Sequence, residues 1–172
     1  LAARGIDYRG VLYAGIMITD EGPKVLEYNV RFGDPECQPL MMRMRGSLAE
    51  SALACVEGTL DRVRLDWADD AAACVVMTAP GYPGEYSKGD VIEGIAAANE
   101  LEGVKVFEAG TSRDDDGRVV SSGGRVLGVT ATGGSIAAAL QGAYSAVSAI
   151  SWPGAHYRRD IGHRALDSGA SG

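Results

Sequence analysis

Two segments near the start of the chain have the composition of β-strands, and the second also alternates polar and apolar residues. Residues 10–19 and 24–32 are rich in β-forming side chains, and Asp-Glu-Gly-Pro lies between them. This pattern predicts a hairpin with a short loop. Because side chains alternate across a strand, Glu27, Asn29 and Arg31 should share one face of the second strand. The opposite face, which we expect to be buried, carries Leu26, Tyr28, Val30 and Phe32.

Helical periodicity follows in two places. Ser47 and Glu50 match a capping box, and the apolar stripe behind them predicts a helix over 47–58. Between the predicted hairpin and this helix, Pro39 should allow a regular helix only after itself, and we expect that helix in the sequence LMMRM. The segment 135–150 is also predicted to be a helix. Its apolar side carries Ile136, Leu140, Ala143 and Val147.

The second half of the chain has the pattern of a small antiparallel sheet. The apolar run 71–79 predicts a buried strand, and the Gly- and Pro-rich stretch that follows predicts a loop. Short strands are expected at 91–95 and 104–110. A hairpin is expected from an acidic turn, a strand at 118–121, a break at Gly123-Gly124 and a strand at 125–131.

These elements predict an α+β fold made of two domains. Residues 1–68 would form a hairpin with helices, and residues 69–168 a small antiparallel sheet with one long helix. Residues 169–172 are expected to be a frayed tail. The length of 172 residues and a hydrophobic content of 46% supply enough apolar side chains for a packed core.

Composition narrows the classes of function. A net charge of −7 argues against a general nucleic-acid binder, although a local basic pocket for a small phosphorylated ligand remains compatible with it. No run of 18 apolar residues and no signal-peptide pattern occurs. The three cysteines are widely spaced, which favours reduced thiols and a cytoplasmic protein.

The polar face of the predicted strand has the chemistry of a magnesium site. Glu27 offers carboxylate oxygens, and Asn29 adds a carbonyl oxygen without adding negative charge. Mg²⁺ takes such oxygens, usually from one or two protein groups together with nucleotide phosphates. Arg31 could bind an anionic substrate as a fork-shaped donor. The alternative is that Glu-x-Asn occurs here by chance and that Arg31 is a solvated charge at a sheet edge.

Two further stretches have both a structural and a functional interpretation. Asp34 before Pro35 resembles a helix N-cap with a first-turn proline, but the carboxylate could equally contact a ligand. Gly123 and Gly124 followed by Arg125 could bind a phosphate, or could form an ordinary hairpin bulge beside a surface arginine.

Several strings resemble, in the same order, the phosphoribosylamine–glycine ligase family (glycinamide ribonucleotide synthetases). They are GVLYAGIMIT, KVLEYNVRFGDPECQPLMMRM, VVMTAPGYPGEYSKGDVI, KVFEAGT, SSGGRVLGVTATG and RRDIGHRAL. The resemblance implies the end of an ATP-grasp domain followed by the family's C-terminal domain. It also implies a step of purine biosynthesis, in which ATP activates glycine as an acyl phosphate and 5-phosphoribosylamine attacks it. Glycinamide ribonucleotide, ADP and phosphate are the products.

The resemblance also implies roles for individual residues. Glu27 and Asn29 match the family's Mg²⁺ or Mn²⁺ ligands. Arg31 and Asp34 match catalytic positions, and Gly33 lies in the same motif on the substrate side. The set Gly123, Gly124 and Arg125 falls where related ligases hold the ribose phosphate.

Family members are much longer than this chain, so we expect the remaining part of such a ligase to be its principal partner. The 172 residues alone are expected to lack ligase activity, because they would not form a complete ATP pocket. Two other interpretations stay open. The chain could belong to another ATP-grasp ligase or carboxylase of purine metabolism, or it could be a non-catalytic interaction module that keeps the fold.

Overall fold

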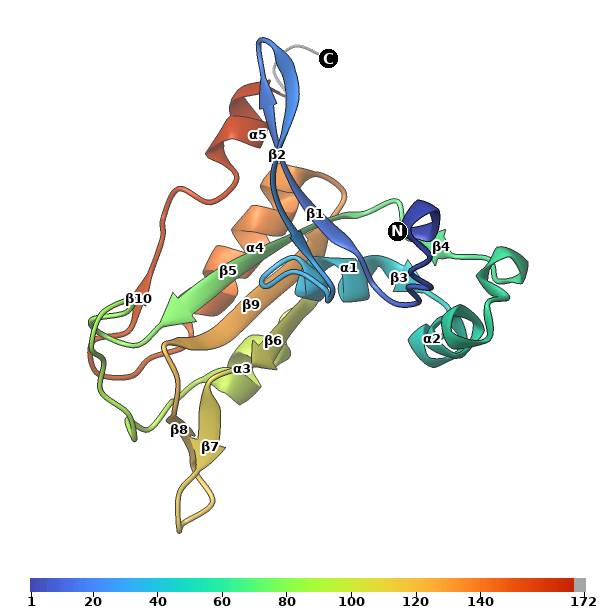
Figure 1. Cartoon of the computed structure of the whole chain (residues 1–172). Helices are drawn as coiled ribbons and strands as arrows, with labels where there is room; N and C mark the ends of the chain where they lie inside the picture. The colour runs from blue at the N-terminus through green and yellow to red at the C-terminus, as the bar shows by residue number, and fades with distance from the viewer. Residues whose placement is uncertain (169–172) are drawn as a thin grey trace. The chain divides into compact units, whose positions relative to one another are not determined.

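The computed structural model describes residues 1–168, which divide into two compact units (Figure 1). Unit 1 comprises residues 1–37 and 44–67, and unit 2 comprises residues 38–43 and those from 68 onwards. The predicted tail, 169–172, lies outside the described residues. The predicted domains, 1–68 and 69–168, rest on sequence pattern and stay a prediction.

Unit 1 contains the predicted hairpin. Strand β1 (Tyr13–Thr19) pairs antiparallel with β2 (Gly22–Asn29), and the register is interrupted between Gly15 and Ile16. The second strand ends three residues earlier than predicted, so Arg31 lies beyond it. The reason is the register: Tyr13, the first residue of β1, pairs with Asn29, and no strand residue remains to pair with the chain that follows.

The expected burial of the hairpin's apolar face is wrong. Leu26, Tyr28 and Val30 are exposed by 65%, 64% and 72%, and Phe32 is half-buried. Within unit 1 the two strands contact mainly each other, and no other described element of this unit forms a layer over them. A two-stranded ribbon alone cannot enclose its own side chains, because each strand has a face that only another element can cover.

The remainder of unit 1 is short elements around one helix. Helix α2 (Leu48–Glu57) begins after Ser47, whose hydroxyl accepts from the Glu50 amide at 3.2 Å, which confirms the predicted helix and its N-cap. Gly58 ends α2 in the left-handed conformation. The other elements are η1 (Ala2–Arg4), η2 (Leu60–Arg62), β3 (Met44–Arg45) and its partner β4 (Asp66–Trp67).

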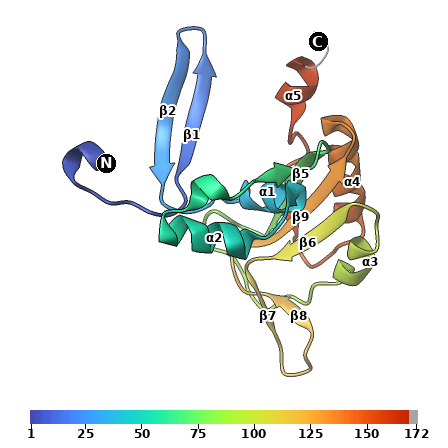
Figure 2. The same ribbon diagram turned by 90° about the vertical axis from the view of Figure 1, so that its right-hand side faces the viewer.

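Unit 2 is built on a four-stranded antiparallel sheet with the order β10-β5-β9-β6 (Figures 1 and 2). Strands β5 (Ala71–Thr78) and β6 (Val104–Glu108) confirm two predictions, and β9 (Arg125–Gly133) confirms a third. Strand β10 (His156–Tyr157) adds a short edge. Helix α4 (Ile136–Ser148) packs over β5 and β9, as Figure 2 shows, and confirms the predicted long helix.

The core of unit 2 lies between this sheet and α4. Leu140, Ala143 and Val147 of the predicted apolar stripe are buried, whereas Ile136 at the start of the helix is 43% exposed. A glycine lets the two layers approach, since a Cβ at Gly142 would lie 3.1 Å from that of Ala131. The largest fully buried side chains belong mostly to β5 and β9: Met77, Leu127, Val75, Val126, Val129, Val147, Thr130 and Ser121.

The strand predicted at 91–95 is wrong. Only isolated bridges form there, from Val91 and from Glu93, and helix α3 (Ile95–Asn99) follows directly. The cause is Gly94, which has a positive φ of 86° and lies so close to the Ala149 carbonyl that a Cβ would overlap it. A residue in this conformation ends the extended segment and begins the helix.

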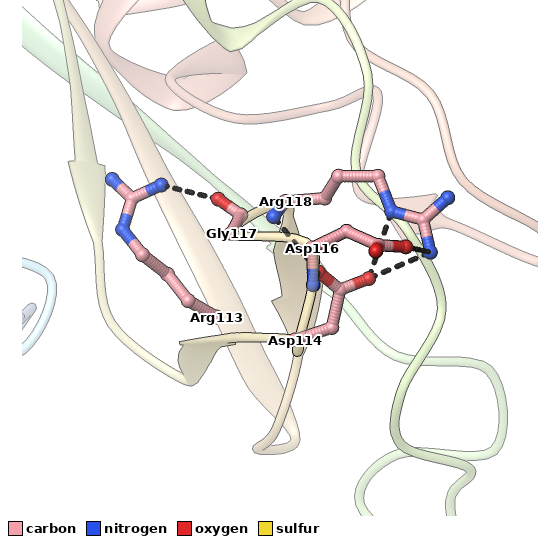
Figure 3. Close-up of polar contacts among 5 residues, drawn as sticks. All are labelled: Arg113, Asp114, Asp116, Gly117 and Arg118. Carbon is pink, nitrogen blue, oxygen red and sulfur yellow. Dashed lines mark hydrogen bonds and ion pairs between the residues drawn. The ribbon is translucent and has the colours of Figure 1, made fainter.

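The predicted hairpin around 118–131 has a different pairing. Strand β8 (Val119–Ser121) pairs with β7 (Thr111–Arg113), while β9 pairs with β5 and β6. Figure 3 shows the loop between β7 and β8. Asp114 accepts from the backbone amides of Asp116 and Arg118 at 3.1 and 2.8 Å, and its other oxygen pairs with the Arg118 guanidinium at 2.8 Å. The acidic turn therefore connects β7 to β8, and the hairpin that it forms does not include β9.

Two expectations about helix α1 and the loop before it are also wrong. Helix α1 (Cys37–Arg43) starts two residues before Pro39, because a proline in the first turn needs no intrahelical amide bond. Since α1 begins at Cys37, Asp34 is not the residue that precedes it and does not serve as its N-cap. The last element is α5 (His163–Ser168). No helix within residues 1–168 is both long and apolar enough to cross a bilayer.

Candidate functional site

Glu27 and Asn29 lie on one face of β2, as the alternation predicted. No irregularity separates them, and their cross-strand partners on β1 are Gly15 and Tyr13. Glu27 is exposed and Asn29 is half-buried, so both side chains are accessible. Gly15 leaves room for the glutamate, since a Cβ there would come within 3.0 Å of the Glu27 Cγ.

A second carboxylate, which the sequence did not single out, lies beside this pair. The Tyr13 hydroxyl donates to the Glu36 Oε1 at 3.2 Å. The pKa of Tyr13 is raised, chiefly by the Glu36 charge and further by Glu27, while Arg31 opposes the rise. Glu27, Arg31 and Glu36 thus lie close enough to Tyr13 to act on its hydroxyl. The only signal in the sequence was that Glu36 ends the same motif as Asn29.

The loop after β2 brings these groups together. Gly33 is buried, and a Cβ at this position would overlap the Glu36 carboxylate, so the close approach requires glycine. Arg31 Nη1 donates to its neighbouring carbonyl, that of Phe32, at 2.7 Å. Burial raises the pKa of the Cys37 thiol, and the Asp34 charge raises it further, which locates Asp34 near the start of α1.

The donor set of β2 fits a magnesium or manganese ion that is shared with a nucleotide. Glu27 supplies carboxylate oxygens and Asn29 an amide oxygen, and within residues 1–168 neither side chain makes a hydrogen bond or ion pair that would compete. The described residues contain no group of three or more His, Cys, Asp or Glu able to hold a metal by themselves. Magnesium typically completes such a two-ligand site with water and phosphate oxygens.

The glycines before Arg125 are required by the protein's own packing in unit 2. A Cβ at Gly124 would overlap the ring of Tyr82, and Gly123 lies against the backbone of Gly110. The β5–β9 ladder is irregular here, since Thr78 pairs with Arg125 and Met77 with Leu127. The local geometry is therefore that of a bulge beside an exposed arginine, at the start of β9.

The Arg125 guanidinium nevertheless has a defined orientation. Its Nε donates to the Tyr82 hydroxyl at 3.2 Å, and the backbone carbonyl of Arg125 accepts from Gly110 at 2.9 Å. Both ends of the residue are therefore held. The Glu27 and Asn29 pair of β2 and this arginine belong to different units of the structure.

A shallow hollow of about 290 Å³ is formed near the end of unit 2, around the string RRDIGHR. Its Arg158 makes two parallel bonds to Asp160, Nε to Oδ1 at 2.9 Å and Nη2 to Oδ2 at 2.7 Å. This hydrogen-bonded pairing lowers the pKa of Asp160. Arg159 instead lies over the ring of Tyr157, 5.3 Å from its centroid.

Comparisons with known proteins agree on one family. The family model described as "Phosphoribosylglycinamide synthetase, C domain" matches residues 72–164, and the one described as "Phosphoribosylglycinamide synthetase, ATP-grasp (A) domain" matches residues 1–37. A phosphoribosylamine–glycine ligase of Rhodopirellula baltica is 56% identical over 92% of this chain. The chloroplastic ligase of Arabidopsis thaliana is 53% identical over 96%, and a ligase of Escherichia coli is 51% identical over 97%.

A solved structure from the same family is also similar to this chain. The crystal structure of a phosphoribosylamine–glycine ligase from Thermotoga maritima matches 92% of this chain with a TM-score of 0.78 and 34% sequence identity. It supports the predicted fold, an ATP-grasp end followed by a C-terminal domain. The chain spans only 38% of that structure and 36%, 32% and 39% of the three curated relatives, in the order given above.

Proposed function

The chain belongs to the phosphoribosylglycinamide synthetase family, and from this premise we propose that it supplies part of a phosphoribosylamine–glycine ligase. Such a ligase joins glycine to 5-phosphoribosylamine at the expense of ATP. It forms glycinamide ribonucleotide, ADP and phosphate in purine biosynthesis. We use the term complete ligase for a chain in which residues 1–172 are accompanied by the part that the longer relatives have.

The observation that carries the proposal is the Glu27 and Asn29 pair. The two side chains share one accessible face of β2, within the segment that matches the ATP-grasp model. They would hold a divalent cation, Mg²⁺ or Mn²⁺, together with the phosphates of ATP. When bound, the ion offsets negative charge on the phosphoryl group that is transferred.

The side chains around this pair would bind and orient the other reactants. Arg31 would contact the transferred phosphoryl group or the glycine carboxylate, where a planar cation with several donors stabilises anionic oxygens. Asp34 would contact an amine, and Gly33 would let the loop approach the substrate. In unit 2, Gly123, Gly124 and Arg125 would bind the ribose phosphate of 5-phosphoribosylamine.

Other parts of the proposal follow from the family. ATP is the co-substrate that the ATP-grasp model implies, and the choice between magnesium and manganese is left to measurement. The partner is the remainder of the complete ligase, and the 172 residues alone would have no ligase activity. A cytoplasmic location fits the three free thiols, although one relative is named as chloroplastic.

The test measures ADP formation by the complete ligase. We expect ADP only when glycine and 5-phosphoribosylamine are both present, and none when formate or bicarbonate replaces glycine. Glu27→Gln should abolish turnover, because the amide keeps the shape but removes the charge that binds the cation. Glu21→Gln is the matched control, since Glu21 is an exposed carboxylate of the same hairpin whose ion pair, with Lys24 at 3.0 Å, lies away from the Glu27 and Asn29 pair.

Two results would overturn the proposal. ADP formation that depends on formate or bicarbonate would indicate another ATP-grasp ligase or carboxylase. Full activity of Glu27→Gln would mean that the hairpin has no catalytic role, as in a non-catalytic interaction module.

A further inference from the structure

Tyr82 helps to orient the Arg125 guanidinium. The phenol oxygen accepts the Nε–H of Arg125 at 3.2 Å, across 43 residues of sequence. A guanidinium is planar, so fixing its Nε–H fixes the plane in which its other donors lie. Two-point binding of a phosphate depends on that plane, because both N–H groups must meet phosphate oxygens together.

The tyrosine is itself held in place by the glycine beside the arginine. A Cβ at Gly124 would overlap the Cδ2 of Tyr82 and lie 2.7 Å from its Cε2. The absence of a side chain therefore lets the ring lie directly against the backbone. The ring also meets Tyr86 edge-on, with 6.2 Å between the ring centroids, and the Tyr86 Cε1 would lie 3.1 Å from the same Cβ.

Backbone hydrogen bonds also connect Tyr82 to the residue that precedes Arg125. The Gly124 carbonyl accepts from Ala79 at 2.9 Å, and the Ala79 carbonyl accepts from Tyr82 at 3.3 Å. Tyr82 and Arg125 are thus joined twice, once through side chains and once through the backbone of Ala79 and Gly124. A second cation adjoins the pair, since the Lys88 Nζ lies 5.8 Å from the centroid of the Tyr86 ring.

We propose that Tyr82 is a positioning residue that orients Arg125 for the phosphate monoester of the sugar substrate. This inference rests on the proposed function, in which Arg125 is the phosphate ligand. Tyr82 acts through Arg125 and forms no bond to the reacting atoms. The Lys88 ammonium adds positive charge near the same tyrosines, which favours a dianionic phosphate over a neutral sugar.

The experiment compares Tyr82→Phe, Arg125→Ala and Tyr86→Phe in the complete ligase. Tyr82→Phe should raise the KM for 5-phosphoribosylamine about 3- to 10-fold, the effect of losing one hydrogen bond. The KM values for glycine and ATP, the kcat and the thermal midpoint should stay unchanged. The inhibition constant of ribose 5-phosphate should rise by the same factor. Tyr86→Phe is the control, because it keeps both ring contacts and the bond between Tyr82 and Arg125.

The outcomes separate the inference from the proposed function. If Arg125→Ala weakens ribose 5-phosphate binding while Tyr82→Phe behaves like Tyr86→Phe, the positioning role is wrong and the ligase remains. If Arg125→Ala leaves ribose 5-phosphate binding intact, Arg125 is no phosphate ligand and the inference fails with it. A wild-type complete ligase without ADP formation from glycine and 5-phosphoribosylamine would instead refute the function itself.

Discussion

Leu127 anchors the strand that begins with Arg125, and its truncation tests how that strand is held. The side chain is 1% exposed and lies in β9, between Met77 of β5 and Glu108 of β6. Leu127→Ala removes three buried carbon atoms. At about 0.8 kcal/mol for each, the lost transfer free energy is about 2.4 kcal/mol. The cavity left behind adds to this, so we expect a loss of about 3–5 kcal/mol in the free energy of unfolding.

Urea unfolding followed by tryptophan fluorescence measures the loss of stability of unit 2. The chain has two tryptophans, and Trp152 is part of the buried core of unit 2, whereas Trp67 is 43% exposed in unit 1. A Trp67→Phe background leaves Trp152 as the reporter. The control is Leu101→Ala, because Leu101 is 41% exposed and should lose less than about 1 kcal/mol.

The transition of Leu127→Ala should shift to lower urea at unchanged slope, which identifies a change of stability rather than of the denatured state. A loss within about 1 kcal/mol of the Leu101→Ala value would refute the reasoning. It would mean that β9 is not fixed by the packing between the sheet and α4.

Three smaller perturbations test local interactions. Ser135→Ala should destabilise α4 by about 1 kcal/mol in urea unfolding, because the Ser135 hydroxyl accepts a hydrogen bond from the Ala138 amide at 3.2 Å. An unchanged free energy of unfolding would show that solvent replaces the cap. Glu36→Gln should lower the pKa of Tyr13 toward its ordinary value in a ¹³C NMR titration, and an unmoved titration would contradict the contact. Partial burial raises the pKa of Asp114, but bonds from Arg118 outweigh it and the net pKa is lowered. The β7–β8 turn should therefore be protected from amide exchange above the unfolded Asp pKa of about 3.9. It should lose this protection as the pH falls through the lower folded pKa, and protection that does not depend on pH in the acid range would oppose this.

Local signals in the sequence predicted elements well. The Ser47 cap and the apolar run of β5 each act within a few residues, so the sequence contains most of what determines them. The same holds for Glu27 and Asn29, whose common face follows from the alternation of a strand.

Features that depend on distant partners were missed. Arg31 lies outside β2 because β1 starts at Tyr13, a fact of register that no local pattern encodes. The contact between Tyr13 and Glu36 depends on the same register. The strand at 91–95 failed because Gly94 meets a carbonyl more than 50 residues away, that of Ala149.

The exposed hairpin illustrates a third kind of error. The alternation of Leu26, Tyr28 and Val30 correctly predicted one apolar face, but a periodic pattern does not say which element covers it. In the structure no layer of unit 1 does so. Burial is a property of the whole packed assembly, whereas periodicity is a property of the strand.

Paramagnetic broadening by Mn²⁺ tests the central claim, that Glu27 and Asn29 together hold the divalent cation. Mn²⁺ alone is titrated into the ¹⁵N-labelled 172-residue chain, and the amide signals that broaden first are identified. We expect broadening centred on Glu27, Asn29 and their cross-strand neighbour Tyr13, lost in Glu27→Gln and retained in Glu21→Gln. Broadening centred on the acidic turn at 114–116, or equal broadening in both variants, would contradict it.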